Sequence, residues 1–241
     1  MMNEIIIEKI PEQNYAVDEA MNRLATSLTF CGGDIKVIEL TSRFAGEGKS
    51  YVSLNLMRTF ADLGKSVVLV DADLRRSNMV QRYRMKFLKD VPNGLAQYLA
   101  KMCGAEDIVY KTNIPNAFFV PVGKLVNSSL RLLTGPLFEQ FIASLREKYD
   151  IVLIDTPPVG SIVDAVEIAK SCDGSLLVAR YGTGTKKELS AVAASVSQTG
   201  CPVIGIVMNM VDMRSITNRK YYYAKGYYGY YKSNDTNAAD S

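Results

Sequence analysis

The chain has 241 residues, of which 48% are apolar and 22% charged, and its net charge is +3. These values are ordinary for one globular domain with a large core, and so small a charge gives no argument for binding to nucleic acid or to a membrane. The sequence has no histidine. This excludes Ser-His-Asp hydrolysis, a His-dependent cysteine protease and a His-ligated zinc site, so acid–base chemistry must fall to Asp, Glu, Lys or Tyr.

The N-terminal stretch MMNEIIIEKIPEQNY carries acids and a three-Ile run, which is not the pattern of a signal peptide. The stretch after it predicts an N-terminal helix at about 17–28. No run of the sequence approaches the roughly 20 apolar residues that a helix needs to cross a bilayer. The four cysteines are far apart without a Cys-x-x-Cys pair, so we expect buried or partly buried thiols instead of a zinc cluster or a redox pair.

Apolar runs alternate with longer stretches of helical spacing along most of the chain. The runs predict strands at 36–40, 66–70, 150–154, 175–179 and 202–208. The stretches predict helices at 50–63, 137–148, 164–170 and 186–198, and the weaker region between predicts a short helix at 93–101 and a short strand at 118–120. Strands this apolar are buried on both faces, so we predict an α/β fold whose mostly parallel sheet has helices on both faces. Ligands in such sheets bind at the carboxyl ends of the strands.

A glycine-rich run, TSRFAGEGKS, connects a predicted strand to the helix after it, which is the context of a phosphate-binding loop. Gly46 and Gly48 would let the backbone turn and present N–H groups to phosphate oxygens. Lys49 would contact the β- and γ-phosphates of a nucleoside triphosphate, and Ser50 would bind magnesium. The strict pattern has a glycine where this chain has Arg43.

Three carboxylates follow the apolar cores of two later strands. Asp71 and Asp73 are alternate residues and can face the nucleotide together. Asp155 closes the strand YDIVLID, where a carboxylate commonly reaches magnesium through a water. One acid suffices to position magnesium, so the extra acid suggests a base for an attacking hydroxyl, and either member of the pair can be that base. Arg75 or Arg76 would balance the acids, touch a phosphate or remain a solvated surface charge.

Residues 214–241 break this pattern and predict a mobile tail that holds half of the chain's fourteen tyrosines. The tail tyrosines are Tyr221, Tyr222, Tyr223, Tyr227, Tyr228, Tyr230 and Tyr231. So many phenols would be costly to bury without a partner for each hydroxyl. They are phosphoryl acceptors, a surface that stacks on single-stranded nucleic acid, or a tail without a specific role.

The loop, the segments VVLVDADLRRS and IVLIDTPP and the tyrosine tail together resemble the bacterial tyrosine kinases of capsule and exopolysaccharide synthesis, over roughly residues 15–232. The resemblance implies a P-loop kinase domain at 1–213 followed by the tail at 214–241. It also implies ATP and Mg²⁺ as cofactors, and a protein-tyrosine kinase that autophosphorylates the tail of a neighbouring subunit.

The resemblance assigns roles by position in the family's motifs. The implied catalytic residues are Lys49, Asp71, Asp73 and Asp155. The implied magnesium ligands are Ser50, Asp71, Asp73 and Asp155. The implied nucleotide contacts are Ala45, Gly46, Glu47, Gly48, Lys49, Ser50, Tyr51 and Asn209. The last of these matches the position at which related ATPases recognise the base.

In Gram-positive bacteria the family has a form without a membrane segment, and the resemblance to it implies a cytoplasmic kinase. It also implies a membrane-anchored activator, of the chain-length-determinant type, that recruits the kinase to the inner face of the plasma membrane. Its substrates include sugar-nucleotide dehydrogenases and glycosyltransferases, and nucleic acid is not a partner. Members form homo-oligomeric rings through an E-x-x-R-x-x-R motif. This chain keeps Glu19, but Asn22 and Ala25 replace both arginines and Arg23 is offset by one, which implies a weaker or differently built ring.

Two other classes remain open. Partition and septum-placement ATPases share the fold, but they carry a lysine five residues before the loop lysine, where this chain has Phe44, and they lack a tyrosine tail. A non-catalytic module could bind nucleotide and use the tail for docking. The intact Lys49, Ser50 and three carboxylates argue against lost chemistry.

Overall fold

The computed structural model describes residues 3–11, 14–32, 35–88, 93–124, 129–159 and 163–212. The predicted tail, with its seven tyrosines, lies outside the described residues. Within the described part of the chain, no helix is both long enough and apolar enough to span a membrane.

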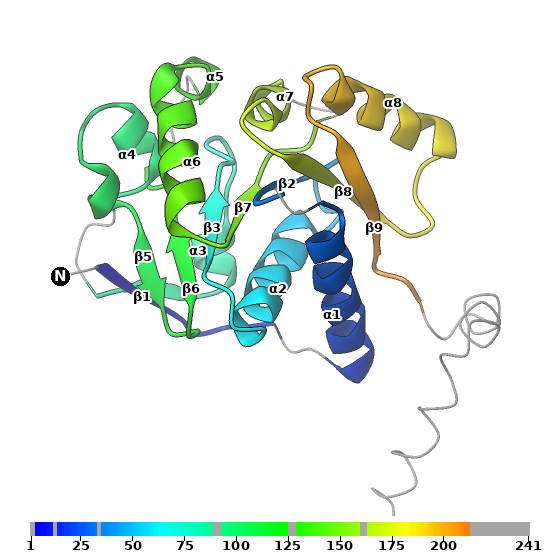
Figure 1. The fold of residues 1–241 in the computed structure, drawn as a ribbon, viewed down its shortest axis with the longest axis horizontal. Coiled ribbons are helices and arrows are strands. Elements are labelled where there is room, and N and C mark those ends of the chain that lie inside the picture. The colour runs from blue at the N-terminus through cyan, green and yellow to red at the C-terminus, as the bar shows by residue number, and fades with distance from the viewer. Residues whose placement is uncertain are drawn as a thin grey trace, which may run out of the picture.

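The described residues form one nine-stranded sheet in the order β4-β1-β5-β6-β3-β7-β2-β8-β9 (Figure 1). Its strands are β1 (Asn3–Ile7), β2 (Val37–Ser42), β3 (Val67–Asp71), β4 (Met85–Phe87), β5 (Tyr110–Thr112), β6 (Ala117–Val120), β7 (Ile151–Asp155), β8 (Gly174–Arg180) and β9 (Val203–Asn209). The pairs β1–β4 and β5–β6 are antiparallel, and the other neighbours are parallel. The prediction of a mostly parallel sheet is therefore confirmed.

Helices cover both faces of the sheet. One face packs against α1 (Tyr15–Phe30), α2 (Lys49–Asp62) and α3 (Met79–Arg82). The other packs against α4 (Leu95–Leu99), α5 (Ser129–Leu133), α6 (Pro136–Lys148), α7 (Asp164–Ala169) and α8 (Lys186–Ser197). A 3₁₀ turn, η1, spans Ala105–Asp107.

Strand β3 shows why a central strand of this sheet has a run of apolar residues. Val67 and Leu69 belong to the core on the α1–α2 face, whereas Val68 and Val70 belong to the core on the α6 face. Successive side chains of a strand point to opposite faces, so a strand covered on both sides needs apolar residues at every position. Strand β7 has the same pattern, whereas in β2 the buried Glu39 interrupts the apolar run. The strands β3, β7 and β2 lie side by side in the centre of the sheet, where their carboxyl ends meet.

The sequence did not predict the three strands at the far edge of the sheet. The N-terminal three-Ile run is β1, in which Ile5 and Ile7 are buried and Ile6 is 40% exposed. Strands β4 and β5 have only three residues each. The thiol prediction was wrong for Cys31, which is exposed; the other three cysteines are buried or partly buried, and all four are free.

Candidate active site

The phosphate loop joins the end of β2 to the start of α2. Gly46 and Gly48 have φ values of 82° and 93°, in the left-handed region that favours glycine. Lys49 begins the helix, its side chain is almost buried, and its Nζ lies 3.2 Å from Ser42 Oγ. The backbone bends as a phosphate-binding loop requires, and the loop opens at a helix N-terminus.

Two acids meet at the ends of neighbouring strands. Asp71 of β3 and Asp155 of β7 are register partners, and both are buried. Asp155 is held from α2, because Ser50 Oγ donates to its Oδ2 at 2.6 Å and Ser53 Oγ to its Oδ1 at 3.1 Å. Ser53 was not among the predicted site residues, although it lies one helical turn after Lys49 and its place on the same helix face follows from that spacing.

Burial sets the charge of these acids. It raises the pKa of Asp71 well above the usual range, and the nearby Asp155 raises that pKa further, against a hydrogen bond from Ser77. Burial also raises the pKa of Asp155, while Lys49 and the Ser50 hydroxyl lower it. Two buried carboxylates side by side favour a site that a cation completes.

Asp73 is less buried than Asp71 and lies closer to solvent. Its Oδ1 accepts from the backbone N–H of Arg76 at 3.0 Å, which fixes the turn after β3. All three predicted acids line one cleft of about 540 Å³ together with much of the loop. The cleft is lined by Ala45, Gly46, Gly48, Lys49, Ser50, Asp71, Asp73, Arg75, Arg76, Ser77, Asn78, Arg82, Asp155, Thr156 and Pro158.

The arginines near the acids divide into two kinds. Arg75 donates through Nε and Nη2 to the carboxylate of Asp164, at 2.9 and 3.0 Å, so its charge is used in an ion pair with a buried acid. Ser129 donates to the same carboxylate at 2.5 Å. Arg76 and Arg82 form no ion pair with any other described residue, and both line the cleft. They are the arginines available to a phosphate.

Three predicted nucleotide contacts do not bring their side chains to this cleft. The Glu47 carboxylate turns toward Arg43, and Asn209 Nδ2 donates to the Glu47 carbonyl at 3.0 Å, so Asn209 contacts the loop itself. Tyr51 lies in the first turn of α2 and does not line the cleft. Their nucleotide contacts, and base recognition by Asn209, stay predictions.

The residues present fit Mg²⁺. Hydroxyl and carboxylate oxygens converge from Ser50, Asp71, Asp73 and Asp155, and these are the ligands that magnesium prefers. Within the described residues, no group of three or more His, Cys, Asp and Glu side chains is arranged to hold a metal by itself. Magnesium typically takes only one or two carboxylates and completes its shell with phosphate oxygens and water, so this arrangement suits a metal that arrives with a nucleotide.

The altered ring motif lies on α1. Glu19 Oε1 accepts from Arg23 Nε at 2.8 Å on the exposed face of the helix, and Asn22 is exposed beside them. Ala25 is fully buried against the core. The position of the second lost arginine is therefore not on the surface of this chain.

The fold and the site define a P-loop nucleotide-binding protein, and the family model described as "AAA domain" matches residues 35–180. The chain is 33% identical over 209 residues to the tyrosine-protein kinase CpsD of Streptococcus agalactiae serotype III (strain NEM316), a match that covers 87% of this chain and 88% of that protein. The chain belongs to the bacterial tyrosine-protein kinases of the CpsD type, which regulate capsule synthesis. The predicted family and enzyme class are thus confirmed.

Solved structures agree. The kinase domain of the Escherichia coli tyrosine kinase ETK superposes with a TM-score of 0.77 and 28% identity, covering 83% of this chain and 77% of that chain. The septum site-determining protein MinD from Pyrococcus horikoshii, complexed with Mg-ADP, has a TM-score of 0.61 and 26% identity, covering 72% and 69%. The fold is shared by both classes, and the likeness to the kinase is the more extensive.

Proposed function

We propose that this cleft transfers the γ-phosphoryl group of ATP to tyrosine hydroxyls in the tail of a neighbouring subunit. The observation that carries the proposal is the number of acids: Asp71 and Asp73 line the same cleft as the loop and Asp155. Transfer to a phenol needs a carboxylate that positions the metal and a second group that accepts the phenolic proton, and this cleft has acids enough for both.

Each residue has a distinct role in this proposal. Lys49 neutralises the β- and γ-phosphates, and since Ser42 engages one of its three N–H groups, two remain for phosphate oxygens. Ser50 and Asp155 hold Mg²⁺, with Asp71 and Asp73 beside them, and the bound ion neutralises charge on the phosphates. Arg76 and Arg82 add positive charge along the cleft.

Either acid of the pair can take the phenolic proton. Asp71 is deeper, and its carboxylate accepts a hydrogen bond from Ser77. Asp73 is more open to an incoming side chain. Comparing the phosphorylation rates of Asp71→Asn and Asp73→Asn at saturating Mg-ATP identifies the base, because only one of the two variants should lose the pH dependence of the rate.

Membership of the CpsD-type family supports the wider setting. The kinase domain at 1–213 acts in the cytoplasm, at the inner face of the plasma membrane, where a membrane-anchored activator recruits it. It phosphorylates protein substrates such as sugar-nucleotide dehydrogenases and glycosyltransferases. It assembles as a ring that lacks the arginines replaced by Asn22 and Ala25.

Intact mass after incubation with Mg-ATP tests the reaction. The wild type should gain a series of phosphates that map to residues 221–231, and Lys49→Met should gain none. A variant with all seven tail tyrosines changed to Phe should still bind ATP but incorporate little phosphate. Full activity of Lys49→Met would contradict the assignment of the loop, and incorporation that persists in the seven-Phe variant would place the acceptors elsewhere.

A mixing experiment tests the transfer between subunits. Lys49→Met keeps its tyrosines but cannot transfer, whereas the seven-Phe variant can transfer but has no tail acceptors. Their mixture should phosphorylate the Lys49→Met chains, which isotope labelling distinguishes by mass. A mixture without product, beside a wild type that modifies itself, would show transfer within one chain.

A further inference from the structure

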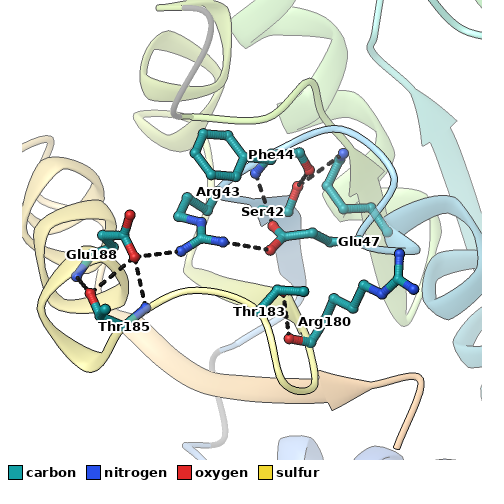
Figure 2. Close-up of polar contacts among 9 residues, drawn as sticks. Ser42, Arg43, Phe44, Glu47, Arg180, Thr183, Thr185 and Glu188 are labelled. Atoms are coloured by element: carbon teal, nitrogen blue, oxygen red, sulfur yellow. Dashed lines mark hydrogen bonds and ion pairs between the residues drawn. The ribbon is translucent and has the colours of Figure 1, made fainter.

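Arg43 occupies the loop position at which the strict phosphate-loop pattern has glycine. Its side chain is only 8% exposed. Nη1 donates to Glu188 Oε2 at 2.8 Å, Nη2 lies 3.9 Å from Glu47 Oε1, and the guanidinium carbon stands 4.4 Å from the centre of the Phe44 ring. Figure 2 shows the guanidinium between the two carboxylates. Arg43 therefore connects Glu47 of the loop to Glu188, which lies 145 positions after Arg43 in the chain.

Glu47 explains why the loop needs this cation. Its side chain is 5% exposed, and its Oε2 accepts from the backbone N–H of Phe44 at 2.9 Å, which closes the turn of the loop. A buried carboxylate beside a phosphate site repels the ligand unless a positive charge is paired with it. Within the described residues, Arg43 is the cation that forms an ion pair with Glu47.

Glu188 anchors the other end of the connection. It is the third residue of α8, and it forms a capping box with Thr185, whose backbone N–H and hydroxyl donate to Glu188 Oε2 at 2.7 and 2.9 Å. The same oxygen accepts from Arg43 (Figure 2). Since the cap fixes Glu188, the start of α8 holds Arg43 in place.

Gly184 provides the space for the guanidinium. A Cβ at this position would lie 1.6 Å from Arg43 Nη1, and the residue has a φ of +77°. Any side chain at position 184 would displace Arg43 from the carboxylates. The loop before α8 is thus shaped around this arginine.

We propose that Arg43 is a positioning residue for nucleotide binding, which neutralises Glu47 inside the phosphate loop and ties the loop to the first turn of α8 through Glu188. The inference rests on the nucleotide site of the proposed function and does not depend on which residue accepts the phosphate. Loss of Arg43 leaves the loop lysine and the acids in place, so it should weaken binding more than transfer.

The dissociation constant of Mg-ADP, measured by calorimetry on the full chain, tests this proposal. Arg43→Ala should raise it on the order of tenfold, because removing one partner leaves a buried charge uncompensated. The phosphorylation rate at saturating ATP should stay within about twofold of the wild type. The loss of affinity should appear as a higher KM for ATP. Arg146→Ala is the matched control: it removes an arginine that is ion-paired with Asp173, outside the cleft, and should leave the dissociation constant unchanged.

Double variants separate positioning from general damage to the fold. Glu188→Ala should weaken binding by itself but add little in the Arg43→Ala background, because both changes break one connection. Gly184→Ala should behave in the same way, since its clash is with Arg43. Additive losses of Mg-ADP affinity in the double variants, or wild-type affinity in Arg43→Ala, would overturn this inference and leave the nucleotide site standing. A wild-type chain that does not bind Mg-ADP would overturn the nucleotide site and this inference together.

Discussion

Asp71 and Asp155 stand opposite each other at the last paired position of two parallel strands, β3 and β7. Their side chains are buried, and each carries a raised pKa. The fold therefore places two like charges where they destabilise the chain in the absence of a cation. Such a pair is a functional arrangement because packing alone would favour apolar residues at both positions.

Asp71→Asn should stabilise the metal-free protein and impair it as a kinase. The amide removes a buried charge and can still accept a hydrogen bond from the Ser77 hydroxyl, so the free energy of unfolding in urea should rise at pH 8, because burial and the nearby Asp155 both disfavour the charged carboxylate. The phosphorylation rate should fall by a factor on the order of 10²–10⁴ if Asp71 is the base. An unchanged rate would leave Asp73, or neither acid, as the base.

Glu39 gives the stability of this protein a distinctive pH dependence. It is fully buried in β2, accepts from Ser175 at 2.8 Å and Thr156 at 3.1 Å, and burial raises its pKa from 4.5 to about 7. The folded state holds this proton up to about pH 7, whereas the unfolded chain releases it near pH 4.5. The stabilisation is complete below pH 4.5 and is lost as the pH rises to 7, by roughly 3 kcal/mol.

Glu39→Gln should remove that loss. Urea unfolding of the wild type should show stability falling between pH 5 and 7, and the variant should show a flatter profile and greater stability at pH 8. The chain has no histidine, so the imidazole groups that usually titrate in this window are absent. Equal slopes in the two proteins would show that Glu39 is ionised throughout.

The pair of Arg75 and Asp164 should contribute to stability more than surface ion pairs do. Arg75→Ala leaves the buried Asp164 carboxylate with Ser129 as its hydrogen-bond donor. The free energy of unfolding should fall by about 2 kcal/mol. This loss is smaller than that expected for a fully buried ion pair, because Arg75 is partly exposed. The matched control is Arg23→Ala on α1, whose pair with Glu19 is exposed on both sides and should cost less than about 1 kcal/mol. Similar losses in the two variants would contradict this ranking.

The two loop glycines offer a matched pair of substitutions. Both have positive φ, but a Cβ at Gly46 meets nothing within 4 Å, whereas one at Gly48 would lie 2.0 Å from Asn209 Nδ2. Gly46→Ala should cost only the backbone strain, about 1–2 kcal/mol. Gly48→Ala adds the clash, and should reduce Mg-ADP affinity well beyond the Gly46→Ala value. Isothermal titration of each variant with Mg-ADP gives the two dissociation constants. Equal constants would show that the clash between a Cβ at position 48 and Asn209 does not affect nucleotide binding.

Local patterns were sufficient to predict the centre of this molecule. Strands β2, β3 and β7 have apolar side chains on both faces, and the phosphate loop and the acids lie at their ends, so one rule about parallel sheets located the cleft. The edge strands were missed because β4 and β5 are three residues long and take their conformation from their neighbours.

Contacts between distant segments were beyond the sequence patterns. Nothing near Arg43 indicates Glu188, and nothing near Arg75 indicates Asp164, because each pair meets only through the order of the strands. Arg75 and Arg76 are adjacent in the chain but have different environments. The side chain of one meets a buried acid, while the other faces the cleft.

The register of β2 has a consequence for how the chain folds. Val37 pairs with Val152 and Ile38 with Gly174. Strand β2 therefore cannot pair with its neighbours until more than a hundred further residues have joined the fold. Long-range parallel pairing closes large loops before it gains contacts, which makes folding slow and leaves apolar strands uncovered in the meantime. A nascent chain that ends before β7 has the whole phosphate loop but lacks Asp155. Nucleotide binding that uses Asp155 can therefore stabilise only a chain that already includes β7.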